Sequence, residues 1–212
     1  MAKSEVHNID CMAFMRGIPN KHFDLCVTDP PYGINLAGNS FRGKHEKKDW
    51  DCNVPDKTFF DELFRISKNQ IIWGGNYFGL PPNKHFLIWD KEQGFDFSSA
   101  MCEYAWSSLD KPAKLFRFDA RKRKTNIHPT MKPIELYSWI FKHYARKGET
   151  IFDPMMGSGS SRIAAYMLGI DYVGCEIDTN YYNQSQEWFD RMCKGKIMQK
   201  NDRFIVQQQL FS

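Results

Sequence analysis

The tetrapeptide Asp29-Pro30-Pro31-Tyr32 is the part of the sequence whose residue types most directly suggest chemistry. It combines a carboxylate, an aromatic ring and two prolines, which have no N–H group and leave nearby backbone carbonyls free as acceptors. Several acceptors beside a stacking face suit an amino group on a planar heterocycle. The same residues would also fit a strand that ends in a proline turn, with Tyr32 as ordinary packing.

A glycine-rich turn is the second pattern, and its sequence is Asp153-Pro154-Met155-Met156-Gly157-Ser158-Gly159-Ser160. Glycines let a backbone turn tightly and approach a ligand closely, and a helix start presents unpaired N–H groups. Glu176 follows about 20 residues on, at the end of the next expected strand, where an acidic residue suits a ribose diol. The two features together indicate nucleoside binding. An ordinary strand–helix turn and a surface acid are the alternatives.

The segment 128–133 (HPTMKP) is the third pattern, and it lies immediately before an expected helix. It places the Thr130 hydroxyl and the Lys132 ammonium beside the N-terminus of that helix. Lys132 could meet an anionic group of a ligand, or it could be an exposed lysine on a capped loop.

Charge is unevenly distributed along the chain, although the net charge is only +4. The segment 111–147 holds eleven lysines and arginines, with Asp119 and Glu135 as its only acids. A segregated basic stretch of this kind is typical of a surface that binds a polyanion, and a solvated charged face would look the same.

Composition is that of a globular protein: 212 residues, 42% of them hydrophobic and 25% charged. No apolar run approaches the roughly 18 residues of a membrane span, and the first ten residues do not form a secretory signal. We therefore expect a cytoplasmic protein without membrane contact. None of the six cysteines is spaced as C-x-x-C, so we expect reduced thiols and no metal site.

Apolar runs alternate with helix-like stretches, which favours βαβ units and a mostly parallel sheet with helices on both faces. Expected strands cover residues 5–9, 23–28, 70–73, 86–90, 103–107, 150–153 and 172–175. Expected helices cover residues 11–18, 56–67, 133–144, 160–168 and 179–192. This predicts a single domain over residues 1–193, with inserted segments at about 33–54 and 108–127, and a flexible tail over 194–212.

Three motifs in this order, TDPPYG (28–33), HPTMKP (128–133) and FDPMMGSGS (152–160), resemble the amino-group DNA methyltransferases of the β permutation. The resemblance implies S-adenosylmethionine as cofactor. It also implies the circularly permuted class I methyltransferase fold, a doubly wound, mostly parallel seven-stranded sheet in which one strand is antiparallel. Asp10 would approach the adenine of the cofactor, and Glu176 would bind its ribose. The implied cofactor-binding residues are Asp10, Cys11, Asp29, Thr130, Lys132, Phe152, Asp153, Pro154, Gly157, Ser158, Gly159, Ser160, Glu176 and Ile177.

The implied reaction is methylation of an exocyclic amino group in DNA, with Asp29, Pro30, Pro31 and Tyr32 as catalytic residues. The Asp29 carboxylate and a backbone carbonyl would accept the two N–H bonds and turn the nitrogen lone pair toward the methyl donor. The target base would be flipped out of the duplex and stacked on Tyr32. An aspartate at the head of the tetrapeptide favours adenine N6. Cytosine N4 is the first alternative, and a catalytically silent nucleic-acid-binding protein is the second.

Double-stranded DNA is the expected partner, held by the basic segment and by the 33–50 loop. The candidate DNA-binding residues are Arg42, Lys44, Lys47, Lys48, Arg117, Arg121, Lys122, Arg123 and Lys124. In the tail, Gln207, Leu210 and Phe211 resemble a short peptide that binds bacterial sliding clamps. A homodimer and a location in a bacterial or phage-infected cell complete the expectations.

Overall fold

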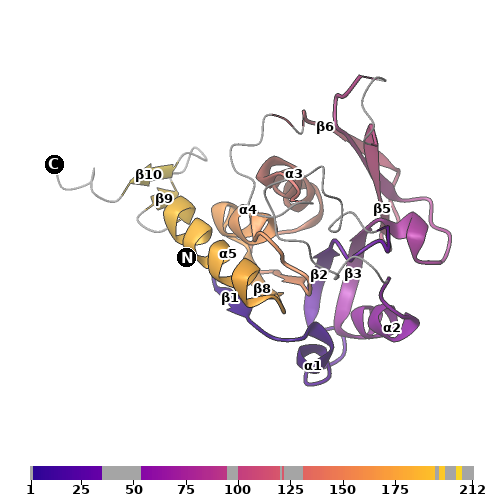
Figure 1. The fold of residues 1–212 in the computed structure, drawn as a ribbon, viewed down its shortest axis with the longest axis horizontal. Coiled ribbons are helices and arrows are strands. Elements are labelled where there is room, and N and C mark those ends of the chain that lie inside the picture. Colours follow the sequence, from indigo (N-terminus) through magenta and orange to yellow (C-terminus); the bar gives the residue numbers. More distant parts are fainter. Residues whose placement is uncertain are drawn as a thin grey trace.

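The computed structural model describes residues 2–34, 54–94, 100–119, 121, 131–193, 196–198 and 204–206, which Figure 1 shows as ribbon. Its strands are β1 (Ser4–His7), β2 (Phe23–Thr28), β3 (Ser67–Trp73), β4 (Phe86–Asp90), β5 (Cys102–Ser107), β6 (Lys114–Arg117), β7 (Thr150–Asp153), β8 (Asp171–Cys175), β9 (Lys196–Met198) and β10 (Phe204–Val206). Its helices are α1 (Cys11–Met15), α2 (Lys57–Ile66), α3 (Ile134–Tyr144), α4 (Ser160–Leu168) and α5 (Thr179–Cys193).

The central sheet has the strand order β1-β8-β7-β2-β3-β5-β4-β6. Strand β5 is antiparallel to both of its neighbours, and the other pairs are parallel. The strand order reverses between β7 and β2, because the chain continues from β7 to β8 on one side and from β2 to β3 on the other. Open α/β sheets bind ligands at the carboxyl ends of the strands beside such a reversal.

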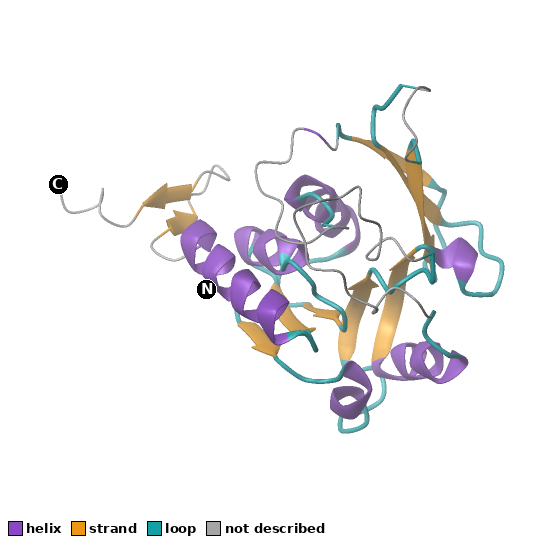
Figure 2. Cartoon of the chain, in the orientation of Figure 1, coloured by secondary structure: helices purple, strands orange, loops and turns teal. Residues whose placement is uncertain are grey.

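Helices cover both faces of this sheet, as predicted (Figure 2). On one face, Leu25 and Val27 of β2 pack with residues of α3 and α4. On the other face, Cys26 of the same strand packs with residues of α1 and α2. The alternation follows from the two-residue period of a strand, so a run as short as FDLCVT supports two cores.

Several elements begin and end where the sequence predicts. Strands β2, β4 and β7 and helix α4 have the predicted bounds. Helix α2 starts after Asp56, whose carboxylate accepts the Phe59 N–H at 3.1 Å. Helix α3 starts directly after Pro133, which has no N–H to leave unpaired there.

The predicted seven-stranded sheet is wrong by one strand, because β6 makes it eight-stranded. This strand lies inside the segment 108–127 that we expected to be an insertion, and it extends the sheet by parallel pairing with β4. The prediction missed it because a strand of four residues that begins and ends with a basic one carries a weak periodic signal. The tail expected to be loose also contains a pair of antiparallel strands, β9 and β10.

Membrane-spanning helices are absent from the part of the chain that the structure describes. Most of the predicted 33–54 insertion lies outside the described residues, as does the end of the tail.

Candidate active site

The Asp29–Tyr32 motif follows the carboxyl end of β2, next to the point where the strand order reverses. The Tyr32 hydroxyl donates a hydrogen bond to Asp29 Oδ1 at 2.6 Å. The Tyr32 ring stacks on Tyr77, with 5.0 Å between ring centroids and 15° between planes. Tyr77 is 45% exposed and belongs to a 3₁₀ turn, Gly75–Tyr77, that follows β3. Two tyrosines from neighbouring strand ends therefore form one aromatic surface beside the carboxylate.

Gly74 is the residue that lets Tyr32 lie so close to β3. Its φ of +69° falls in the left-handed region, which favours glycine. A Cβ at this position would lie 2.2 Å from Cε1 of the Tyr32 ring, which is far inside contact distance. The backbone of the Gly74 turn thus fixes where the ring of the motif can lie.

Lys132 joins the third sequence pattern to the first. Its ammonium forms an ion pair with Asp29 Oδ2 and lies 3.1 Å from Glu103 Oε2. Glu103, on β5, is also paired with Lys91 at 2.7 Å. The ammonium lies 5.2 Å from the centre of the Trp73 ring, and Lys132 is only 4% exposed. Four charged side chains of alternating sign therefore converge on the end of β2.

Burial and pairing compete in this group, and the pKa directions show which effect wins. Burial raises the pKa of Asp29, and the nearby Lys132 ammonium only partly opposes that rise. Burial would lower the pKa of Lys132, but Asp29 and Glu103 together raise it. Burial would raise the pKa of Glu103, but its two lysine partners hold it at about 2. Lys132 and Glu103 are therefore charged at neutral pH.

The glycine-rich turn lies at the ends of β7 and β8, on the other side of the strand reversal. Gly157 and Gly159 both have positive φ, +55° and +80°, as a tight turn into a helix requires. The Gly157 N–H donates to Glu176 Oε2, and the Asp178 N–H donates to Glu176 Oε1, both at 2.8 Å. Glu176 therefore holds the turn, and its carboxylate oxygens still have lone pairs for a ligand hydroxyl.

Asp153 is a second carboxylate in this turn, and it is 1% exposed. It accepts hydrogen bonds from the Met155 N–H at 3.2 Å and from the Ser161 hydroxyl at 2.6 Å. Burial raises its pKa to about 7, and the charges of Asp29 and Glu176 add to the effect. Asp29 and Asp153 follow or end the neighbouring parallel strands β2 and β7. The tetrapeptide and the glycine-rich turn are therefore close enough for these two carboxylates to influence each other.

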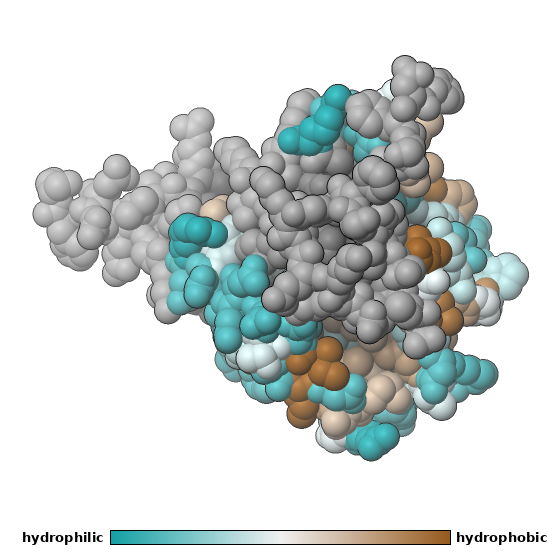
Figure 3. Space-filling model, viewed as in Figure 1, coloured by the Kyte–Doolittle hydropathy of each residue, from teal (hydrophilic) through white to brown (hydrophobic). Residues whose placement is uncertain are grey.

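The end of β1 completes this side of the site. The Asn8 side chain donates to the backbone carbonyls of Glu176 and Ile177 at 2.8 and 3.2 Å, which fixes the loop after β8. Ile177 is 67% exposed and Ile9 is 39% exposed. Figure 3 shows apolar surface in the region between β8 and α1. Asp10 uses Oδ1 to cap α1 through the Ala13 N–H, at 2.9 Å.

The structure brings together most of the candidate cofactor residues at the ends of β1, β7 and β8. Cys11 is buried at the start of α1, Phe152 is buried in β7, and Ser158 lies 3.0 Å from Ser160 between their hydroxyl oxygens. The cofactor contacts of all these residues stay predictions. Lys132 lies apart from them, on the Asp29 side, where its ammonium contacts two carboxylates. Thr130 lies outside the described residues.

Two of the candidate DNA-binding arginines are described, and both are paired with acids. Arg117 lies 3.3 Å from Asp90, and Arg121 forms a two-point pair with Asp119 at 2.9 Å. Seven further candidates fall outside the described residues: Arg42, Lys44, Lys47, Lys48, Lys122, Arg123 and Lys124. So do Gln207, Leu210 and Phe211 of the tail.

Sequence reasoning missed Glu103, Lys91 and Tyr77. One signal for Glu103 is present, since a charged residue inside the strand CEYAWS is unusual unless it is paired. Tyr77 follows the Gly74-Gly75 pair, which predicted only that the strand before it ends there. Its partner ring lies 45 positions away, so no local pattern links the two.

Comparisons with known proteins agree with the motifs. A family model described as DNA methylase matches residues 98–187. The Type II methyltransferase M1.MboII of Moraxella bovis is 22% identical, over 86% of this chain and 95% of that protein. The crystal structure of an M1.HpyAVI–SAM complex superposes with a TM-score of 0.60 at 16% identity, over 87% of this chain and 98% of that one. The cytosine-N4-specific PvuII DNA methyltransferase gives a TM-score of 0.62 at 12% identity, over 87% and 86%.

The chain is related to the DNA amino-methyltransferases. The family predicted from the three motifs is thereby confirmed, and so is the class I methyltransferase fold. The proteins that the chain resembles include both adenine N6 and cytosine N4 enzymes, and the comparisons agree equally with either target.

Proposed function

We propose that this methyltransferase transfers a methyl group from S-adenosylmethionine to the N6 amino group of adenine in DNA. The observation that carries the proposal is a carboxylate beside an aromatic surface, at a strand end adjacent to a turn that suits a cationic nucleoside. The two halves lie on opposite sides of the strand reversal, where α/β sheets of this kind bind their ligands.

The residues of the turn fit this cofactor on the basis of charge. Asp153 and Glu176 are buried carboxylates, and in the described part of the chain neither is paired with a lysine or arginine. Burial raises the pKa of both, so a ligand cation would stabilise their charged forms. A phosphate-bearing nucleotide would meet repulsion here. S-adenosylmethionine carries a sulfonium and an ammonium, and it supplies an electrophilic methyl group.

Asp29 and the backbone carbonyl of Pro30 would accept the two N–H bonds of the target amine. This favours a pyramidal nitrogen, whose lone pair then points toward the methyl donor. The Asp29 oxygens already accept from the Tyr32 hydroxyl and from Lys132. Each oxygen keeps a second lone pair, so the amine adds a partner without displacing one.

Tyr32 would stack on the target base after the base leaves the duplex. Extrusion costs a few kcal/mol, and stacking returns about 1–3 kcal/mol per base. Tyr77 stacks on the Tyr32 ring and so limits where that ring can move. The choice of adenine rests on the aspartate at the head of the tetrapeptide, and cytosine N4 is the alternative.

Double-stranded DNA would be held by the basic segment, including Arg117 and Arg121, and by the candidates outside the described residues. The pairing of both arginines with acids reduces the charge that they offer to phosphates. The sliding clamp, the homodimer, the cytoplasmic location and the single-domain division stay predictions.

Nucleoside analysis of methylated DNA tests the proposal directly. The protein is incubated with unmethylated DNA and S-adenosylmethionine, and the DNA is then digested and its nucleosides are separated. N6-methyladenine supports the proposal, and N4-methylcytosine moves the assignment to cytosine. Cofactor binding without a methylated product would favour the catalytically silent alternative.

A further inference from the structure

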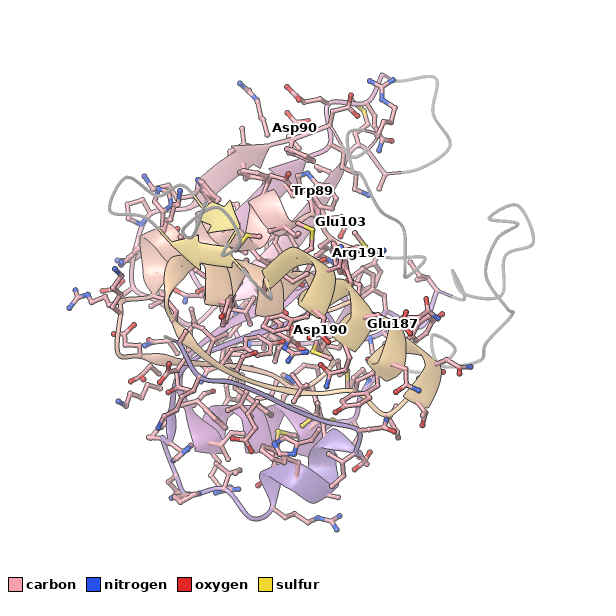
Figure 4. All side chains as sticks on the ribbon, turned by 90° about the vertical axis from the view of Figure 1, so that its left-hand side faces the viewer. Trp89, Asp90, Glu103, Glu187, Asp190 and Arg191 are labelled. Carbon is pink, nitrogen blue, oxygen red and sulfur yellow. The ribbon has the colours of Figure 1, made fainter. Side chains whose placement is uncertain are left out.

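Glu103 has no role in the proposed reaction as described so far, yet it lies within reach of the catalytic group. It comes from β5, the antiparallel strand, and its carboxylate lies between two lysines, at 2.7 Å from Lys91 and 3.1 Å from Lys132. Figure 4 places Glu103 inward from Trp89 and Asp90 of β4. The side chain is 22% exposed and the Lys132 side chain only 2%. This is a buried charge network and not a surface ion pair.

One carboxylate would be enough to balance the charge of Lys132. With Asp29 as its only carboxylate partner, the buried ammonium would bind that carboxylate strongly, because charges interact strongly where water is excluded. Such a pair would withdraw electron density from the oxygens that must accept the N–H groups of the target amine. A second carboxylate on the same ammonium reduces this effect.

We propose that Glu103 is a positioning residue, which shares the Lys132 ammonium and so keeps the Asp29 carboxylate available to the target amine. Lys91 pairs with Oε1 of Glu103 and so fixes the carboxylate whose Oε2 faces Lys132. The inference rests on the proposed function and adds to it a residue from β5, two strands away from β2 in the sheet.

The groups that act on Asp29 in the described part of the chain come from four other places in the fold. They are Glu103 on β5, Lys132 before α3, Tyr137 on α3 and Asp153 on β7, in addition to its neighbour Tyr32. Lys132 lowers the pKa of Asp29, and Glu103 raises it. Removing Glu103 and removing Lys132 must therefore shift the pKa of Asp29 in opposite directions.

The test is the rate of a single turnover against pH, with DNA and S-adenosylmethionine both saturating. Methyl transfer requires ionised Asp29, so the rate falls as the pH drops through its pKa. For Glu103→Gln we expect a rate about tenfold lower at neutral pH and a fall that begins at lower pH than in the wild type. For Lys132→Met we expect the fall to begin at higher pH. Glu103→Asp keeps the charge and should keep the wild-type profile.

Glu62→Gln is the matched control, because it removes the same charge from the Glu62–Arg65 pair on α2 and should leave the profile unchanged. Thermal unfolding and calorimetric titration with S-adenosylmethionine check that each variant is folded. An unchanged rate in Glu103→Gln overturns the inference. So does a pH profile that does not move, or one that moves as Lys132→Met does.

Glu103→Gln keeps the shape of the side chain and removes its charge, whereas Glu103→Asp keeps the charge and shortens the side chain. These two variants test the role of Glu103 even if Lys132→Met does not fold. Failure of the inference leaves a wild-type enzyme that still methylates DNA. Failure of the proposed function leaves no N6-methyladenine from the wild type or from any variant.

Discussion

The two sides of the strand reversal hold buried carboxylates by different means. On the β2 side, Asp29 and Glu103 are balanced by lysines that directly follow β4 and that lie in the loop before α3. On the β7 side, Asp153 and Glu176 are held by backbone N–H groups and a hydroxyl. The carboxylates of the first side are therefore balanced by charges within the protein, whereas those of the second side have no lysine or arginine partner among the described residues.

Under the proposed function, this difference would let one edge of the sheet serve two ligands. A neutral amine needs an ionised acceptor, and Lys132 favours the ionised form of Asp29 against the rise in pKa that burial causes. A cationic cofactor would itself balance the carboxylates on the β7 side, so that side needs no lysine or arginine partner. Under the proposed function, charge compensation by lysines would mark the side that binds the amine, and its absence would mark the side that binds the cofactor.

The sharpest test of the comparison is Asp29→Ala. It removes the acceptor and leaves the β7 side intact, so methyl transfer should fall by roughly a thousandfold while cofactor affinity changes little. Labelled methyl incorporation and calorimetric titration measure the two effects. Asp61→Ala, which breaks the exposed Lys57–Asp61 pair on α2, is the control. A variant that methylates DNA at the normal rate would contradict the mechanism.

Gly74→Ala should have the next largest effect, because the added Cβ displaces the Tyr32 ring. We expect the transfer rate to fall roughly ten- to a hundredfold, as misplacement by about 1 Å can do. Gly79→Ala is a close control: its φ of +58° gives similar backbone strain, but its Cβ would meet nothing within 4 Å. Equal losses in both variants would mean that strain, and not the ring, causes the effect.

On the β7 side, cofactor affinity should depend on pH through Asp153. Its pKa of about 7 means that the carboxyl is largely protonated at pH 6, and a cationic ligand binds the ionised form more tightly. Affinity should therefore rise with pH up to about 7, by at most about tenfold per unit, and then level off. Proton release on binding, measured by calorimetry in two buffers, should vanish in Asp153→Asn. A flat dependence in the wild type would argue against a cation at this site.

The smallest effect is expected for Arg117→Ala. This arginine is exposed and loosely paired with Asp90, so its loss should weaken DNA binding severalfold and reduce the salt slope by about one. Lys57→Ala on α2, on the opposite face of the sheet from α3, is the control. If the salt slope of DNA binding is the same in both variants, Arg117 does not contact the DNA.

Much of the fold could be predicted because its signals are local. The FDLCVT run, the Asp56 cap and Pro133 each lie within a few residues of the boundary that they set, and the structure confirms those boundaries. Strand β6 escaped prediction because its pairing with β4 is non-local and its residues are not strongly apolar. Glu103 escaped prediction for the same reason, since both of its partners lie on other elements.

The sequence by itself determined the three motifs, their permuted order and the alternation of strands and helices, because residue type and spacing carry that information. Only the tertiary structure decided that Lys132 contacts Asp29 and that Glu103 shares its ammonium. Residues 29, 103 and 132 meet because β2 ends, the antiparallel strand β5 begins and the loop before α3 passes at the same edge of the sheet. The energy of a buried charge depends on what surrounds it there, and position along the chain does not reveal that.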